Sequence, residues 1–141
     1  MKDADLLNYI RQNTEMGIDG IQVVLKNCDD SELTEVLEKQ AEEYRQIYEE
    51  ADKLLHENHA EAKDLNPAAK AATKMTSLMK QITPQSSSKI AEDMIKGSTM
   101  GVTKIIKHMD DYSGDNVEIQ KLAGKLRDTE ESNIEQMKRF L

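Results

Sequence analysis

The sequence predicts an all-α protein, a four-helix bundle with a short crossover helix between its second and third long helices. Aromatic residues make up 4% of the 141 residues and proline occurs twice, a composition typical of long helices and unlike that of a β-sandwich. Apolar residues also recur with the period of an α-helix in four long stretches. We expect a single domain that spans residues 1–141.

The first two long helices are expected over residues 3–27 and 30–59. Between them lies a short polar turn that ends in Asp30 and Ser31. Either side chain can cap the second helix, because it can accept a hydrogen bond from the free amides of the first turn. The apolar stripes of the two helices include Leu7, Ile10, Ile21 and Leu25 in the first, and Leu33, Leu37, Ile47 and Leu54 in the second.

Three further helices are expected over residues 67–82, 86–112 and 115–140. Pro67 suits the first turn of the shortest one, a serine-rich run precedes the next, and a turn with a glycine precedes the last. A helix over 67–82 would measure ~24 Å, which is enough to return along most of a bundle. We therefore predict that it crosses over between two antiparallel hairpins.

A short internal repeat supports two related hairpins. The stretch from Thr14 to Ile21 resembles the stretch from Ser98 to Ile105, and each lies in the middle of a predicted helix. Each stretch contains a glycine, Gly17 or Gly101, although a glycine inside a helix costs about 1 kcal/mol relative to alanine. We expect these glycines to allow a close approach between helices.

Charge and cysteine content limit the possible partners and location. The net charge is −8, the basic residues of the lysine-rich middle, residues 67–107, are diluted, and the chain has few aromatic residues, so we expect no nucleic-acid partner. Nothing in the sequence is apolar enough for a transmembrane segment, and residues 1–10 do not resemble a signal peptide. Cys28 is the single cysteine, which agrees with a cytoplasmic protein.

A bundle of this topology invites a search for carboxylates and histidines that converge in its core. A two-metal carboxylate site takes a Glu from each of two helices and a Glu-x-x-His pair from each of the others. Here Glu130 and Asn133 have that spacing on the stripe of the last helix, and Glu43 lies at the edge of another stripe. The candidates for metal ligands are Glu130, Asn133, Glu43, and the pair His56 and His59.

The chain resembles the ferritin-like superfamily of four-helix bundles, and most closely a bacterial ferritin-like group of unknown function. The resemblance is carried by Leu6-Leu7-Asn8 with Gly17-Ile18-Asp19-Gly20, by Glu32-Leu33 through Glu43-Tyr44, and by Glu130-Glu131-Ser132-Asn133-Ile134. It implies the fold and the crossover topology. It does not imply an activity, because the metal ligands of the superfamily are mostly replaced: Asn133 is a poor substitute for an imidazole ligand.

The middle of the bundle is predicted to contain a layer of polar side chains: Thr14, Gln40, Tyr44, Ser98, Thr129, Glu130 and Asn133. We interpret this layer as a hydrogen-bonded network that fixes the register of the helices. A pocket for a small polar ligand or a weakly bound cation is the alternative. Burial is expected to raise the pKa of Glu130.

These observations predict a non-enzymatic cytoplasmic protein that acts through protein contacts, including association with copies of itself. We expect no resident metal or cofactor. Two alternatives remain: a ferritin-like oxidase or storage protein that binds iron or manganese through Glu130 and Glu43, and a module that binds a small molecule between its helices. Neither the lone Cys28 nor the three histidines lie in a nucleophile–base pattern.

Overall fold

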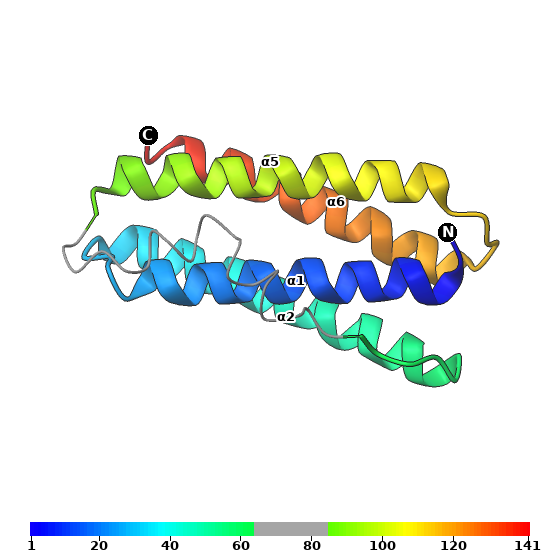
Figure 1. Ribbon diagram of the computed structural model, residues 1–141. Coiled ribbons are helices and arrows are strands. Elements are labelled where there is room, and N and C mark those ends of the chain that lie inside the picture. The colour runs from blue at the N-terminus through cyan, green and yellow to red at the C-terminus, as the bar shows by residue number, and fades with distance from the viewer. Residues whose placement is uncertain (64–84) are drawn as a thin grey trace.

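The computed structural model describes residues 1–63 and 85–141, and these ranges fold into four α-helices. The helices are α1 (Asp3–Leu25), α2 (Ser31–Glu57), α5 (Ser87–Asp111) and α6 (Val117–Lys138) (Figure 1). The prediction of an all-α four-helix bundle is confirmed, and each of these helices ends within two residues of its expected bounds. The helix expected over 67–82 lies outside the described residues.

The helices form two antiparallel hairpins, α1 with α2 and α5 with α6. Helices α1 and α6 run in one direction along the bundle, whereas α2 and α5 run in the other (Figure 1). After α2 the described chain reaches Lys63, whose amide donates to Asn8 Oδ1 near the start of α1 (2.7 Å). It resumes at Gln85, whose amide donates to the carbonyl of Asn27 just after the end of α1 (3.2 Å). The connection from α2 to α5 therefore joins points near opposite ends of α1.

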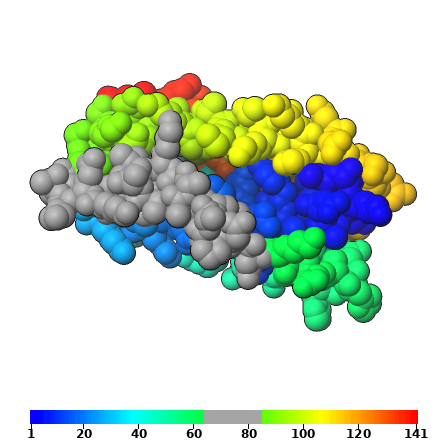
Figure 2. Space-filling view, viewed as in Figure 1, coloured from blue at the N-terminus to red at the C-terminus, as the bar shows by residue number. Residues whose placement is uncertain are grey.

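The two hairpins also pack against each other side by side. In the space-filling view, the first half of α1 (dark blue) lies against the second half of α5 (yellow) (Figure 2). The rings of Tyr9 on α1 and His108 on α5 contact each other there, with their centroids 4.0 Å apart. Helices α2 and α6 form the corresponding contact on the other side of the bundle.

Side-chain caps define where α2 and α6 begin. The carboxyl oxygen Oδ1 of Asp30 accepts hydrogen bonds from the amides of Glu32 and Leu33, so Asp30 caps α2 as expected. Asn116 caps α6 with the same geometry. The second oxygen of Asp30 accepts a hydrogen bond from the Ser87 hydroxyl (2.7 Å), which ties the start of α2 to the start of α5.

Apolar stripes from all four helices fill the core. Leu, Ile and Ala residues at the helical period are fully or almost fully buried, as amphipathic helices require. The fully buried large side chains include Leu7, Ile10, Ile21, Leu33, Leu37, Ile47, Ile90, Ile105, Ile119 and Leu126. None of the helices in the described ranges combines the length and the hydrophobicity needed to cross a membrane.

Candidate functional site: a polar layer in the core

Polar side chains interrupt the apolar core halfway along the bundle, and every helix contributes to this layer. Six of the seven residues expected in it are buried: Thr14, Gln40, Tyr44, Ser98, Glu130 and Asn133. The seventh, Thr129, is half-buried and lies beside a surface groove instead. The structure thus brings the predicted polar layer together, apart from Thr129.

The centre of the layer is a hydrogen bond between Tyr44 on α2 and Glu130 on α6. The Tyr44 hydroxyl donates to Glu130 Oε2 at 2.7 Å. Both side chains are almost completely enclosed, with 3% of each residue exposed. Tyr44 lies fourteen residues after the cap of α2, Asp30, and Glu130 fourteen residues after the cap of α6, Asn116. The pair therefore occupies equivalent positions in the two hairpins.

Two glycines make room for this pair. A Cβ atom built on Gly17 of α1 would lie 2.8 Å from Cε2 of the Tyr44 ring. A Cβ atom on Gly101 of α5 would lie 2.8 Å from Oε1 of Glu130. Both distances are shorter than van der Waals contact, so only glycine fits without a shift of the opposite side chain. The internal repeat thus has a physical basis, because each copy supplies the glycine that receives the side chain of its partner helix.

The Glu130 carboxyl group is in an environment that favours its protonated form. Burial raises the pKa of Glu130 from its ordinary 4.5 to about 7, and the hydrogen bonds of Tyr44 and Ser98 offset part of this rise. Burial together with the nearby Glu130 charge also raises the pKa of Tyr44 well above its usual range. A tyrosine hydroxyl that holds its proton so firmly remains a hydrogen-bond donor to the carboxyl group.

Three other members of the layer differ in how their polar atoms are satisfied. The Thr14 hydroxyl donates to the carbonyl of Ile10 in its own helix (2.9 Å). Gln40 donates to Gln136 Oε1 across the α2–α6 contact (2.9 Å). Asn133 lies near the Tyr44 hydroxyl and lowers the pKa of that group, but neither polar atom of its amide has a well-aligned hydrogen bond to the described chain.

The candidate metal ligands do not converge. Glu130 and Asn133 are buried together, but Glu43 is exposed on the outside of α2, and His56 and His59 are exposed at its end. Residues 1–63 and 85–141 contain no group of three or more His, Cys, Asp or Glu side chains arranged to hold a metal ion. One carboxylate with a tyrosine, a serine and an asparagine is not a donor set that fits a two-metal carboxylate centre.

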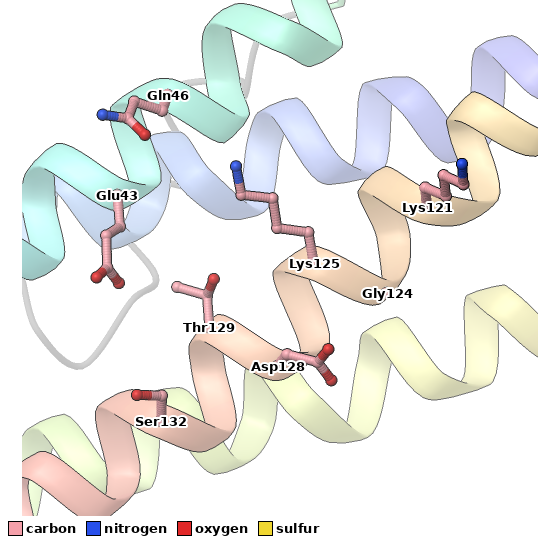
Figure 3. A pocket seen from close by; sticks show the side chains of 8 residues that line it. All are labelled: Glu43, Gln46, Lys121, Gly124, Lys125, Asp128, Thr129 and Ser132. Carbon is pink, nitrogen blue, oxygen red and sulfur yellow. The ribbon is translucent and has the colours of Figure 1, made fainter.

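A polar groove lies between α2 and α6, outside the polar layer. It has a volume of about 630 Å³. The residues that line it are Glu43, Gln46, Lys121, Gly124, Lys125, Asp128, Thr129 and Ser132. Lys125 extends from α6 toward Gln46 on α2 (Figure 3). Glu43 and Thr129, which border the groove, immediately precede Tyr44 and Glu130 in the sequence. The groove therefore borders the same turns of α2 and α6 as the Tyr44–Glu130 hydrogen bond.

Two buried polar residues of α1 were not expected from the sequence. Arg11 forms an ion pair with Asp52 on α2 (3.0 Å) and stacks over the ring of Tyr48. The Asn8 amide donates to the carbonyl of Glu61 and accepts from the amide of Lys63 (3.0 and 2.7 Å), so it holds the segment that follows α2 against α1. Their positions just beside the apolar stripe were the only signal in the sequence that could have indicated burial.

Among the comparisons with known proteins, the solved structures support the fold. Neither a family model nor a curated protein matches the sequence. The structure is similar to a DUF305 fragment from Deinococcus radiodurans, with a TM-score of 0.79, 13% identity, and 97% of this chain and 93% of that chain covered. It is also similar to CopM in the Cu(II)-bound form, with a TM-score of 0.75, 14% identity and coverage of 99% and 95%. At such low identity the likeness shows the four-helix fold alone.

Proposed function

We propose that this chain is a non-enzymatic helical-bundle protein that acts through contacts with other proteins, including copies of itself. In this proposal the polar layer is a ferritin-like metal site that has lost its ligands and serves as a structural hydrogen-bond network. The observation that supports it most strongly is the Tyr44–Glu130 hydrogen bond. A phenol paired with a single carboxyl group supports the proposal, because a two-metal site needs several carboxylates.

The surface and the cysteine content support the remaining parts of the proposal. Met100 and Ile106 are exposed on α5, at 57% and 39%, and such apolar side chains can contribute to a protein contact. Cys28 is a free thiol, which suits the reducing cytoplasm. The binding of a small molecule in the bundle would be an alternative role for the polar layer.

Metal content tests the proposed loss of the metal site. The purified protein is loaded anaerobically with Fe(II), Mn(II) or Cu(II), desalted and analysed by mass spectrometry, with Glu130→Ala beside it. Cu(II) is included because CopM is copper-bound. We expect no stoichiometric metal in the parent. Retention of metal that is lost in Glu130→Ala, but kept in the control Glu131→Ala at an exposed position, would contradict the proposal.

A variant with both His56 and His59 replaced by alanine distinguishes a surface site from a core site. These side chains are exposed and three residues apart, a spacing that can chelate a metal ion. Copper retained by the parent and by Glu130→Ala, but lost in the double variant, would point to a copper-binding role at the end of α2 instead.

Sedimentation equilibrium tests the association of copies. The proposal predicts a concentration-dependent increase in the mean mass above the 16.0 kDa of one chain. Met100→Lys, which places a charge on the exposed apolar position, is expected to weaken this association, whereas the neighbouring exposed Thr99→Lys is expected to leave it unchanged. A monomer at every accessible concentration would remove self-association from the proposal.

A further inference from the structure

Helices α2 and α6 are joined by polar contacts at three levels of the bundle. Arg139 forms an exposed ion pair with Glu32 (3.2 Å), Gln40 is hydrogen-bonded to Gln136, and Tyr44 is hydrogen-bonded to Glu130. Only the third contact involves a buried carboxyl group. Its strength therefore depends on whether that group carries a proton, whereas the Gln40–Gln136 contact cannot change charge.

The groups that face Glu130 from the other helices are neutral. Tyr44 lies against Glu130 from α2, and Ser98 and Gly101 lie against it from α5. On α1 the nearby group is Tyr9, whose pKa the charge of Glu130 helps to raise. His108 on α5 lies one ring further away, against Tyr9, and burial lowers its pKa so that it stays uncharged near neutral pH. No cation contributes to the pKa of Glu130, so an ionised Glu130 would be a buried charge held only by neutral donors.

A surface groove borders the same turns of α2 and α6 as the buried pair. The groove between α2 and α6 is bordered by Glu43 and Thr129, the residues that precede the buried pair on each helix. The charged groups that line the groove are all exposed: Glu43, Lys121, Lys125 and Asp128 (Figure 3). A buried charge without a cation is stabilised most readily by hydration, and the groove is an opening to solvent at these turns.

We propose that the Tyr44–Glu130 contact is a proton-operated latch between α2 and α6. With a proton on its carboxyl group, Glu130 stays buried and accepts the hydrogen bond of Tyr44, so the two helices remain closed at this level. When the proton is lost, the carboxylate draws in water from the groove and the helices separate there. The latch does not depend on the proposed function, because it concerns the state of the bundle itself.

The distance between α2 and α6 across the groove tests the latch. Spin labels are attached to Gln46→Cys and Lys125→Cys, both at exposed positions, in full-length protein with Cys28→Ser and with metal ions removed by a chelator. Double electron–electron resonance spectroscopy then measures the distance between the two labels at about pH 5.5 and about pH 8.5. These values lie on either side of the pKa of Glu130. We expect a longer and broader distribution of distances at the higher pH.

Variants of the labelled protein assign the change to Glu130. Glu130→Gln, which imitates the protonated side chain, is expected to keep the short distance at both pH values. Glu43→Gln, which removes the neighbouring exposed carboxylate, is expected to respond like the parent. The same distance at both pH values in the parent, or the same increase in Glu130→Gln, would overturn the proposal.

Tyr44→Phe provides a second test in case Glu130→Gln does not fold. In the latch the hydrogen bond of Tyr44 holds α2 and α6 closed, so its removal is expected to move the midpoint of the opening to a lower pH. A midpoint that Tyr44→Phe leaves unchanged would contradict the latch, because the transition would then not involve this contact.

Discussion

The buried carboxyl group of Glu130 links the stability of the bundle to pH. Its pKa is about 7 in the folded chain and close to the ordinary 4.5 in the unfolded chain, so the folded state binds the proton more tightly. The stability that this proton contributes is complete below about pH 4.5 and is lost as the pH rises through about 7.

We predict that Glu130→Gln reduces this pH dependence. A difference of one pKa unit corresponds to about 1.4 kcal/mol, so the free energy of unfolding of the parent should fall by about 3 kcal/mol between pH 4.5 and 7 on account of this group. Urea unfolding followed by circular dichroism at a series of pH values measures it. The slope should be smaller in Glu130→Gln and unchanged in Glu131→Gln, whose carboxylate is exposed. Equal slopes in parent and Glu130→Gln would show that another group is responsible.

Gly97 and Gly101 of α5 allow a matched test of whether the Glu130 carboxyl group needs a glycine opposite it. In Gly101→Ala the new methyl group would meet the Glu130 carboxyl group, which must shift and weaken its bond to Tyr44. Overpacking of this kind costs about 1–3 kcal/mol, more than the gain in helix propensity of about 1 kcal/mol. We therefore expect a net loss of about 1 kcal/mol in the free energy of unfolding.

Gly97→Ala is the control for that substitution. Gly97 lies one turn earlier in the same helix, and a Cβ atom there would meet nothing within 4 Å. We expect this variant to be more stable than the parent by about 1 kcal/mol, as helix propensity alone dictates. Similar destabilisation of both variants in urea unfolding would mean that Gly101 is required for some reason other than the space it leaves for Glu130.

At the scale of the helices, the side-chain caps explain why α2 and α6 begin where they do. Asn116 accepts hydrogen bonds from the amides of Glu118 and Ile119, which have no partner within the helix. Asn116→Ala is expected to lower the free energy of unfolding by about 1 kcal/mol. Asp115→Ala, at the preceding exposed position, should leave it nearly unchanged. Thermal or urea unfolding that finds both variants equal to the parent would show that the cap does not stabilise α6.

Helices and their buried faces could be predicted because each depends on local periodicity. The stripe of α6 passes through Glu130 and Asn133, so their burial follows from the same period as that of Leu126. The contacts between helices could not be predicted in this way. That Tyr44 would meet Glu130, or that Asn8 would hold the segment after α2, depends on how whole helices are rotated and shifted against each other. The sequence also gave no sign that Thr129 turns toward the groove.

At the scale of the whole molecule, the two hairpins are similar in construction but not in chemistry. Asp30 and Asn116 cap equivalent helices, and Gly17 and Gly101 receive equivalent side chains, yet these side chains are a tyrosine and a glutamate. A symmetric pair of carboxylates could bind metal ions, whereas the observed tyrosine–carboxyl pair forms one hydrogen bond. The difference between Tyr44 and Glu130 is thus the centre of the functional proposal.

The most direct test is a carbon NMR titration of the Glu130 carboxyl group, assigned by comparison with Glu130→Gln and repeated after exposure to Fe(II), Mn(II) and Cu(II). Our account predicts one protonation step with a midpoint near pH 7, and the same midpoint after metal exposure and desalting. A midpoint near the ordinary 4.5 would show that Glu130 is hydrated rather than buried. Loss of the titration after metal exposure would show that the polar layer binds a metal ion instead of a proton.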